Sequence, residues 1–271
     1  MNDEETLQSS IEQKSGRHSN PQELLEILHD TAARLQNNAK YKQCIKVLTQ
    51  ALSLEIEVFG QDSNKAKESA TKLIKMCNKL AVKMLKIGRF EDCIEFIGND
   101  LSLTGPRYLP NLISLRIVTL NNASSCHRRL GDMEKALSYA QDALNAGLKG
   151  EKDDSLACSH LNICCVYSQN GDHEEALRHS MDALAAANNS VRNNKNQGDG
   201  GESLLNVELD VNDPQRKQKL ATLCIAYHNT GVELEHLKRY EECLEKYEKA
   251  LQVSEMFLPE NREMAASFRQ S

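Results

Sequence analysis

The chain has 271 residues, of which 40% are hydrophobic and 27% charged, and it carries a formal net charge of −6. This negative balance argues against nucleic acid as the main partner, because phosphate binding favours a basic surface. The sequence has no run of about 18 apolar residues, and its acidic N-terminus lacks an apolar core. We therefore expect neither a membrane span nor a signal peptide, and a cytoplasmic location.

The nine cysteines are interpreted as buried, reduced thiols. No two of them form a C-x-x-C pair, so the short ligand spacing of a metal site is missing. A free cysteine packs as a small hydrophobic residue, and cytoplasmic thiols stay reduced. We therefore expect no metal site, no disulfide and no cofactor.

The first part of the chain predicts a helix pair behind a disordered lead. Residues 1–19 are polar and lack periodicity. Asn20 and Pro21 then read as a helix cap and a first-turn proline. Apolar residues recur at helical spacing over 21–60, which predicts two antiparallel helices with a turn at Ala39.

A second helix pair is predicted over 63–105. Its first helix ends at Gly88, and proline residues stop the second helix. The second helix should bury Phe90, Cys93, Ile94 and Ile97.

The centre of the chain repeats one phrase. GDMEKALSYAQDAL (131–144) and GDHEEALRHSMDAL (171–184) agree at most positions and start 40 residues apart. Self-similarity at a fixed period predicts stacked supersecondary units. The third and fourth helix pairs are therefore placed at 111–149 and 153–187.

Beyond these units the composition changes. Residues 188–213 are rich in Asn, Gly and Asp and include Gly-Asp-Gly-Gly, which predicts a flexible insertion. A fifth pair follows over 214–257, so the repeat domain spans 20–257. Segment 258–271 is expected to be a capping helix or the start of a further repeat.

The five units share a pattern of small residues after the turn. The turn residues are Ala39, Gly88, Gly131, Gly171 and Lys238, and five positions later stand Cys44, Cys93, Ala136, Ala176 and Cys243. Small side chains at this place let the two helices of a pair approach closely.

This arrangement resembles the tetratricopeptide repeat, as shown by GRF at 88–90, KRY at 238–240, Gly231 and Tyr247. The units exceed the family's roughly 34 residues and resemble the extended-helix repeats of kinesin light chains and spindle-orientation scaffolds. They depart from the family pattern because no Trp opens a unit and Asp100 replaces the second unit's Ala. The resemblance implies an all-α, right-handed superhelical solenoid of about five antiparallel helix pairs, whose concave groove holds a peptide or a partner helix.

The first helix of each pair should face this groove. Three asparagines occupy one slot in successive units, Asn122, Asn162 and Asn229, and two stand one place before that slot, Asn78 and Asn121. Because an amide both donates and accepts hydrogen bonds, such a ladder can hold a peptide backbone. The alternative is that these side chains bond to neighbouring helix ends.

Basic residues are also expected in the groove, namely Lys75, Lys79, Lys86, Arg128 and Arg129. They favour an acidic ligand, although a solvated charged surface accounts for them equally well.

No enzyme motif is found in the sequence, which has no Gly-rich phosphate loop, no H-E-x-x-H and no G-x-S-x-G. We therefore expect no catalytic residue and no small-molecule substrate. The prediction is a non-enzymatic protein-interaction scaffold or adaptor, cytoplasmic, with cytoskeletal or ciliary association as an option. One alternative is a structural subunit of a large assembly such as a ciliary axoneme, and another is a regulatory domain of a longer enzyme.

Overall fold

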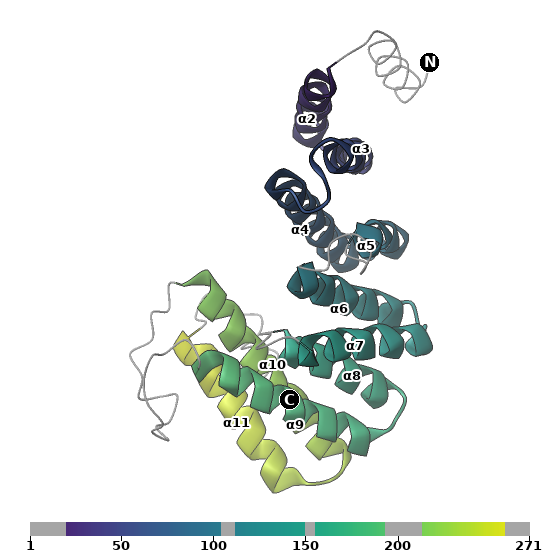
Figure 1. The fold of residues 1–271 in the computed structure, drawn as a ribbon. Helices are drawn as coiled ribbons and strands as arrows, with labels where there is room; N and C mark the ends of the chain where they lie inside the picture. The colour runs from purple at the N-terminus through teal and green to yellow at the C-terminus, as the bar shows by residue number, and fades with distance from the viewer. Residues whose placement is uncertain (1–19, 104–111, 150–154, 193–212, 258–271) are drawn as a thin grey trace. The chain divides into compact units, whose positions relative to one another are not determined.

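The described part of the protein is entirely helical. The computed structural model describes residues 20–103, 112–149, 155–192 and 213–257, which form ten α-helices and no strand (Figure 1). The chain divides into two compact units, Met1–Leu115 and Arg116–Ser271. Within each unit, successive helices pack as pairs, so the predicted all-α repeat architecture is confirmed.

Unit 1 contains two helix pairs. Its helices are α2 (Pro21–Asn37), α3 (Tyr41–Phe59), α4 (Asn64–Lys86) and α5 (Phe90–Leu103), each packed against the next. Side-chain caps start two helices where the sequence predicts. The Asn20 carboxamide accepts from the N–H of Gln22, and the Ser63 hydroxyl accepts from the N–H of Ala66, both at 3.2 Å. Each cap satisfies a donor that the helix leaves unpaired.

The buried face of α5 differs from the prediction at two positions, because Phe90 is half-buried and Ile94 is exposed. Cys93 and Ile97 are buried as expected, but Ile94 is 38% exposed and Phe96 is buried instead. Ile94 lies about 100° around the helix axis from Cys93. Phe96, three positions after Cys93, shares its face.

Unit 2 contains most of α6 and five further helices. Their bounds are α6 (Ile113–Arg129), α7 (Met133–Leu148), α8 (Leu156–Gln169), α9 (His173–Arg192), α10 (Pro214–His236) and α11 (Tyr240–Phe257). Helix α8 packs against α7 and α9, and α10 packs against α9 and α11 (Figure 1). The α10 bounds match the sequence prediction.

All five predicted turn residues adopt the left-handed backbone conformation. Their φ angles are 55° at Ala39, 76° at Gly88, 81° at Gly131, 80° at Gly171 and 60° at Lys238. Glycine enters this region without a steric penalty, whereas Ala and Lys bear a cost of roughly 1–2 kcal/mol. The positions at which the five pairs fold back are therefore confirmed.

The small residues after each turn are tightly packed. Cys44, Cys93, Ala136 and Ala176 are 0% exposed, and Cys243 is 6% exposed. Seven of the nine cysteines are buried and two are half-buried, which fits the prediction that they pack as small hydrophobic residues. Burial raises the pKa of the Cys44 thiol, which favours its protonated form.

Helix α9 continues past the predicted start of the insertion at residue 188. It ends at Arg192 because Val191 is buried in a core that it shares with Leu220 and Leu223 of α10. Tertiary packing of an apolar face supplies most of a helix's stability, and here it overrides the Asn-rich local sequence.

Three predictions concern segments outside the described residues: the lead at 1–19, the remainder of the insertion at 193–212, and segment 258–271. Among the described helices, none has the length and apolar character that crossing a membrane requires.

Candidate interaction face

The first helices of the three pairs in unit 2 present one surface, which we call the first-helix face. Hydrogen bonds join α6 to α8, and α8 packs against α10. Repeat offsets place equivalent exposed or half-buried residues in three rows: Val118, Cys158 and Ile225; Asn122, Asn162 and Asn229; Ser125, Cys165 and Val232. The face therefore has an apolar row beside the asparagine row.

Asn162 is the centre of a hydrogen-bond network between α6 and α8. Its amide nitrogen donates to the backbone oxygen and the side-chain oxygen of Asn121, at 3.2 and 3.1 Å. Its own side-chain oxygen accepts from the Ser125 hydroxyl at 3.1 Å. The Asn121 amide in turn donates to the Ser159 hydroxyl at 3.1 Å. Both amide groups are thus satisfied by neighbouring helices.

The next repeat has an equivalent contact between α8 and α10. Asn229 donates to the sulfur of Cys165 at 3.7 Å. Cys165 occupies the slot of Ser125, and Asn229 occupies the slot of Asn162. In both repeats, therefore, the asparagine bonds to a residue one helical turn further along the preceding first helix.

These contacts bear on the two readings of the asparagine ladder. Asn121 and Asn162 form hydrogen bonds between α6 and α8. These bonds resemble the alternative in which the asparagines bond to neighbouring helices, except that their partners lie along the helix rather than at its end. Asn78 is 7% exposed on α4 of unit 1. Asn122 and Asn229 are half-buried on the first-helix face. Peptide binding by these asparagines stays a prediction.

The predicted basic residues are divided between the units. Lys75, Lys79 and Lys86 lie exposed along one face of α4, and none forms an ion pair within the described part of the chain. Arg128 and Arg129 lie in the last turn of α6, in unit 2. Arg129 is exposed. Arg128 is half-buried, and its Nε has no hydrogen-bond partner among the described residues.

Charge is partitioned between the two kinds of helix in unit 2. The first helices α6, α8 and α10 carry six basic residues and two acidic ones, whereas the second helices α7, α9 and α11 carry five basic and ten acidic residues. The six basic residues are Arg116, Arg128, Arg129, Arg216, Lys217 and Lys219. This partition gives the first helices a positive electrostatic bias in a chain whose net charge is negative.

The two acidic residues of the first helices are both bonded to second helices. Glu233 is 2% exposed, and its Oε2 atom lies within hydrogen-bond distance, 2.8 Å, of Nδ1 of His173 on α9. Glu235 accepts from the Tyr247 hydroxyl of α11 at 2.9 Å, and burial followed by this bond raises the pKa of Tyr247. Both carboxylates are therefore held by the helix pairing within the unit.

Sequence reasoning missed the partners of the asparagines. Ser125, Ser159 and Cys165 were not among the predicted site residues, yet they receive or make the bonds that hold Asn121, Asn162 and Asn229. The available signal was the repeat offset itself, since Ser125 and Cys165 stand at equivalent positions three residues after the asparagine slot.

The architecture is that of a helical-repeat protein, a class in which each helix pair packs mainly on its neighbours. A family model for the tetratricopeptide repeat matches residues 115–189, which contain the third and fourth helix pairs. The predicted resemblance to the tetratricopeptide repeat is therefore confirmed. Such repeats generally serve as interaction scaffolds.

Solved structures of low sequence identity are similar to this chain, and the first two described here share its fold. BtubC (BKLC) from P. vanneervenii is 20% identical, with a TM-score of 0.53, over 85% of this chain and 79% of that chain. The apo form of RapI is 14% identical, with a TM-score of 0.57, over 90% and 74%. TPR-like repeats of a putative kinesin light chain from Podosopora anserina match at 14% identity and a TM-score of 0.46, over 88% and 97%. Among curated proteins, no sequence matches.

Proposed function

We propose that the protein is a non-enzymatic interaction scaffold that binds an acidic, extended segment of a protein partner on the first-helix face of unit 2. The charge partition carries this proposal. The first helices carry six basic residues and two acidic ones, and Arg129 is exposed in the last turn of α6, so the charge of these helices favours a negatively charged ligand.

The face also supplies apolar contact for such a segment. Val118 of α6 and Ile225 of α10 are 40% and 38% exposed in the same row. Apolar residues exposed beside a charged rim are typical of protein-binding surfaces. We therefore expect the bound segment to place carboxylates towards the end of α6 that carries Arg129, and at least one apolar side chain against Val118 or Ile225.

The test is fluorescence anisotropy with labelled synthetic peptides graded in Asp and Glu content. In Arg129→Glu we expect affinity for the acidic peptides to fall about tenfold, because attraction becomes repulsion at an exposed site. Arg192→Glu is the matched control, since Arg192 is also an exposed arginine in the last turn of its helix but lies on the second helix α9. Binding by the wild type should weaken as salt rises. No preference for acidic peptides, or equal losses in both variants, would refute the proposal.

A structural subunit of a larger assembly is the second candidate, because large apolar side chains are exposed on the second helices. Leu148 of α7 is 66% exposed, Met181 of α9 is 55%, and Tyr240 and Leu244 of α11 are 63% and 60%. Burial of this side in an assembly would resist extraction by salt. Release from cells at moderate ionic strength would count against it. For either role we propose a cytoplasmic location, with cytoskeletal or ciliary association.

A further inference from the structure

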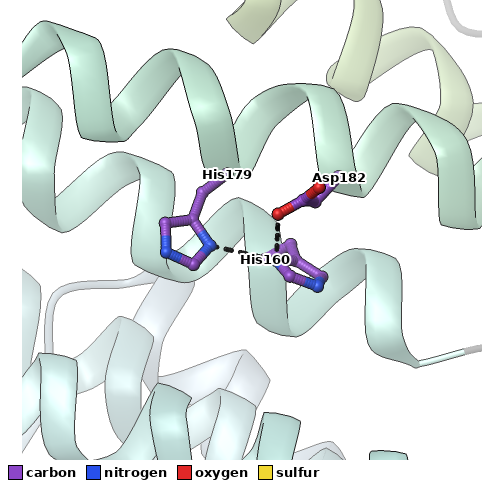
Figure 2. Close-up of side chains that lie close together, drawn as sticks. All are labelled: His160, His179 and Asp182. Carbon is purple, nitrogen blue, oxygen red and sulfur yellow. Dashed lines mark hydrogen bonds and ion pairs between the residues drawn. The ribbon is translucent and has the colours of Figure 1, made fainter.

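A second polar cluster lies apart from the asparagine network, between α8 and α9. His160 comes from α8, while His179 and Asp182 come from α9, three positions apart on one side of that helix (Figure 2). The two Nδ1 atoms are 3.0 Å apart, and His160 Nδ1 lies 3.8 Å from Asp182 Oδ2. One ligand atom from each residue lies within 4.8 Å of the other two.

We propose that His160, His179 and Asp182 bind one divalent transition-metal ion of the zinc class, with a fourth coordination position open to water. Two imidazoles and a carboxylate are a donor set that zinc accepts, and three protein ligands with an open fourth position form a known type of zinc site. Zinc bonds of about 2.0–2.2 Å place tetrahedral ligand atoms roughly 3.3 Å apart. The two separations from His160 Nδ1, 3.0 Å to His179 and 3.8 Å to Asp182, lie on either side of this value.

The exposure of the three residues suits entry of an ion from one side. His179 is 7% exposed and the His160 side chain 16%, whereas the Asp182 side chain is 47% exposed. A half-exposed aspartate has room to turn towards the two rings and close the wider separation. The Tyr167 ring stacks on His179 at 5.8 Å with an interplanar angle of 12°, which holds that imidazole in place.

The charged neighbours of the cluster include one competitor for the ion. Arg178 donates from Nη2 to His179 Nε2 at 2.8 Å and from Nη1 to Asp182 Oδ2 at 3.4 Å. It also donates to Glu175 Oε2 from Nε at 2.9 Å and Nη2 at 2.7 Å. With Glu175 and Asp182 against Arg178, the carboxylates outnumber the guanidinium, so the local charge still favours a cation.

The contact with Arg178 determines which proton must move when the ion binds. A guanidinium only donates, so His179 Nε2 is the acceptor and the ring proton lies on Nδ1, directed at His160 Nδ1. Binding at His179 Nδ1 requires this proton to move to Nε2 by exchange with water, with no net release of protons. Arg178 then gives up His179 and keeps its two bonds to Glu175. We therefore expect Arg178 to weaken metal binding.

The test is a Co²⁺ titration of the full chain followed by competition with Zn²⁺, because the Co²⁺ spectrum distinguishes nitrogen and oxygen ligands from thiolates. We expect one ion per chain without a thiolate charge-transfer band. Affinity should fall at least about tenfold in His160→Gln and in Asp182→Asn, and rise in Arg178→Ala. His29→Gln is the matched control, because His29 contacts Glu55 at 3.1 Å in unit 1 as a histidine–carboxylate pair outside the cluster.

Asp182→Asn decides the outcome if His160→Gln disturbs the fold, since Asp182 is half-exposed and the change preserves its shape. Circular dichroism is used to check that the variants are folded. Equal affinity in the wild type, Asp182→Asn and His29→Gln would overturn the proposal, as would a thiolate band that assigns the ion to cysteines. The peptide-binding proposal is unaffected by either result, because its test uses the separate residue Arg129.

Discussion

Gly231 offers a quantitative test of how closely α10 and α11 pack. A Cβ atom added to Gly231 would lie 2.6 Å from Tyr247 Cε1 and 2.7 Å from Cδ1, well inside van der Waals contact. The ring has little room to yield, because Tyr247 is 9% exposed and its hydroxyl donates to Glu235 at 2.9 Å. We therefore expect Gly231→Ala to strain this helix pair.

The expected magnitude combines two opposing effects. Overpacking a well-packed core costs about 1–3 kcal/mol, whereas replacing glycine by alanine inside a helix gains about 1 kcal/mol. The two contacts below 3.0 Å place the strain in the upper part of its range, so Gly231→Ala should lose up to about 2 kcal/mol of unfolding free energy in urea denaturation followed by circular dichroism. Gly98→Ala is the control, because nothing lies within 4 Å of its added Cβ in α5, and it should stabilise the protein.

A double-mutant cycle isolates the cause. In a Tyr247→Ala background the obstructing ring is gone, so Gly231→Ala should become neutral or stabilising. The coupling between the two positions should reach about 1–3 kcal/mol. If Gly231→Ala stabilises the wild type as much as Gly98→Ala does, the close approach of the two helices is not a constraint and the reasoning fails.

Two further predictions address unit 2. Asn162→Ala should lower the unfolding free energy by about 1–3 kcal/mol, because it strands hydrogen-bonding groups of Asn121 and Ser125. Asn229→Ala, which removes one bond to sulfur, should cost less in the same urea assay, and equal losses would contradict the network. Burial lowers the pKa of His228 below its usual 6.5. The unfolded chain therefore takes up this proton first, and His228 contributes stability above pH 6.5 that is lost as pH falls below it. His228→Gln should flatten this decline in stability–pH profiles, and an unchanged slope would refute the assignment.

The sequence predicted the pairs and their turns well because the signals are local. Helical spacing of apolar residues, a proline at the start of α2 and α10, and glycine at a left-handed position all act within a few residues. Even Ala39 and Lys238, which lack glycine's freedom, were placed by the repeat register and adopt positive φ. The end of α9 was missed because Val191 is buried by α10, whose core residues begin 29 positions later at Leu220.

The candidate site was predictable only in part. The repeat offset identified the slot of Asn122, Asn162 and Asn229, yet an amide in a slot has the same sequence pattern whether it faces a ligand or a neighbouring helix. The distances decide between these roles for Asn162, since its partners are 3.1–3.2 Å away on α6. The separation of basic from acidic residues is apparent only when the first and the second helices of the pairs are counted separately.

The sequence alone determined that this is a tetratricopeptide-like array, because a repeated phrase of small and apolar residues at a fixed offset can bury its faces only by stacking. Only the tertiary structure decided which polar side chains meet. His160 lies 19 residues before His179, and Asn162 lies 41 residues after Asn121, so no short motif joins either pair. Antiparallel pairing and stacking of helices bring such residues into contact, and the geometry of that packing depends on the whole set of side chains between them.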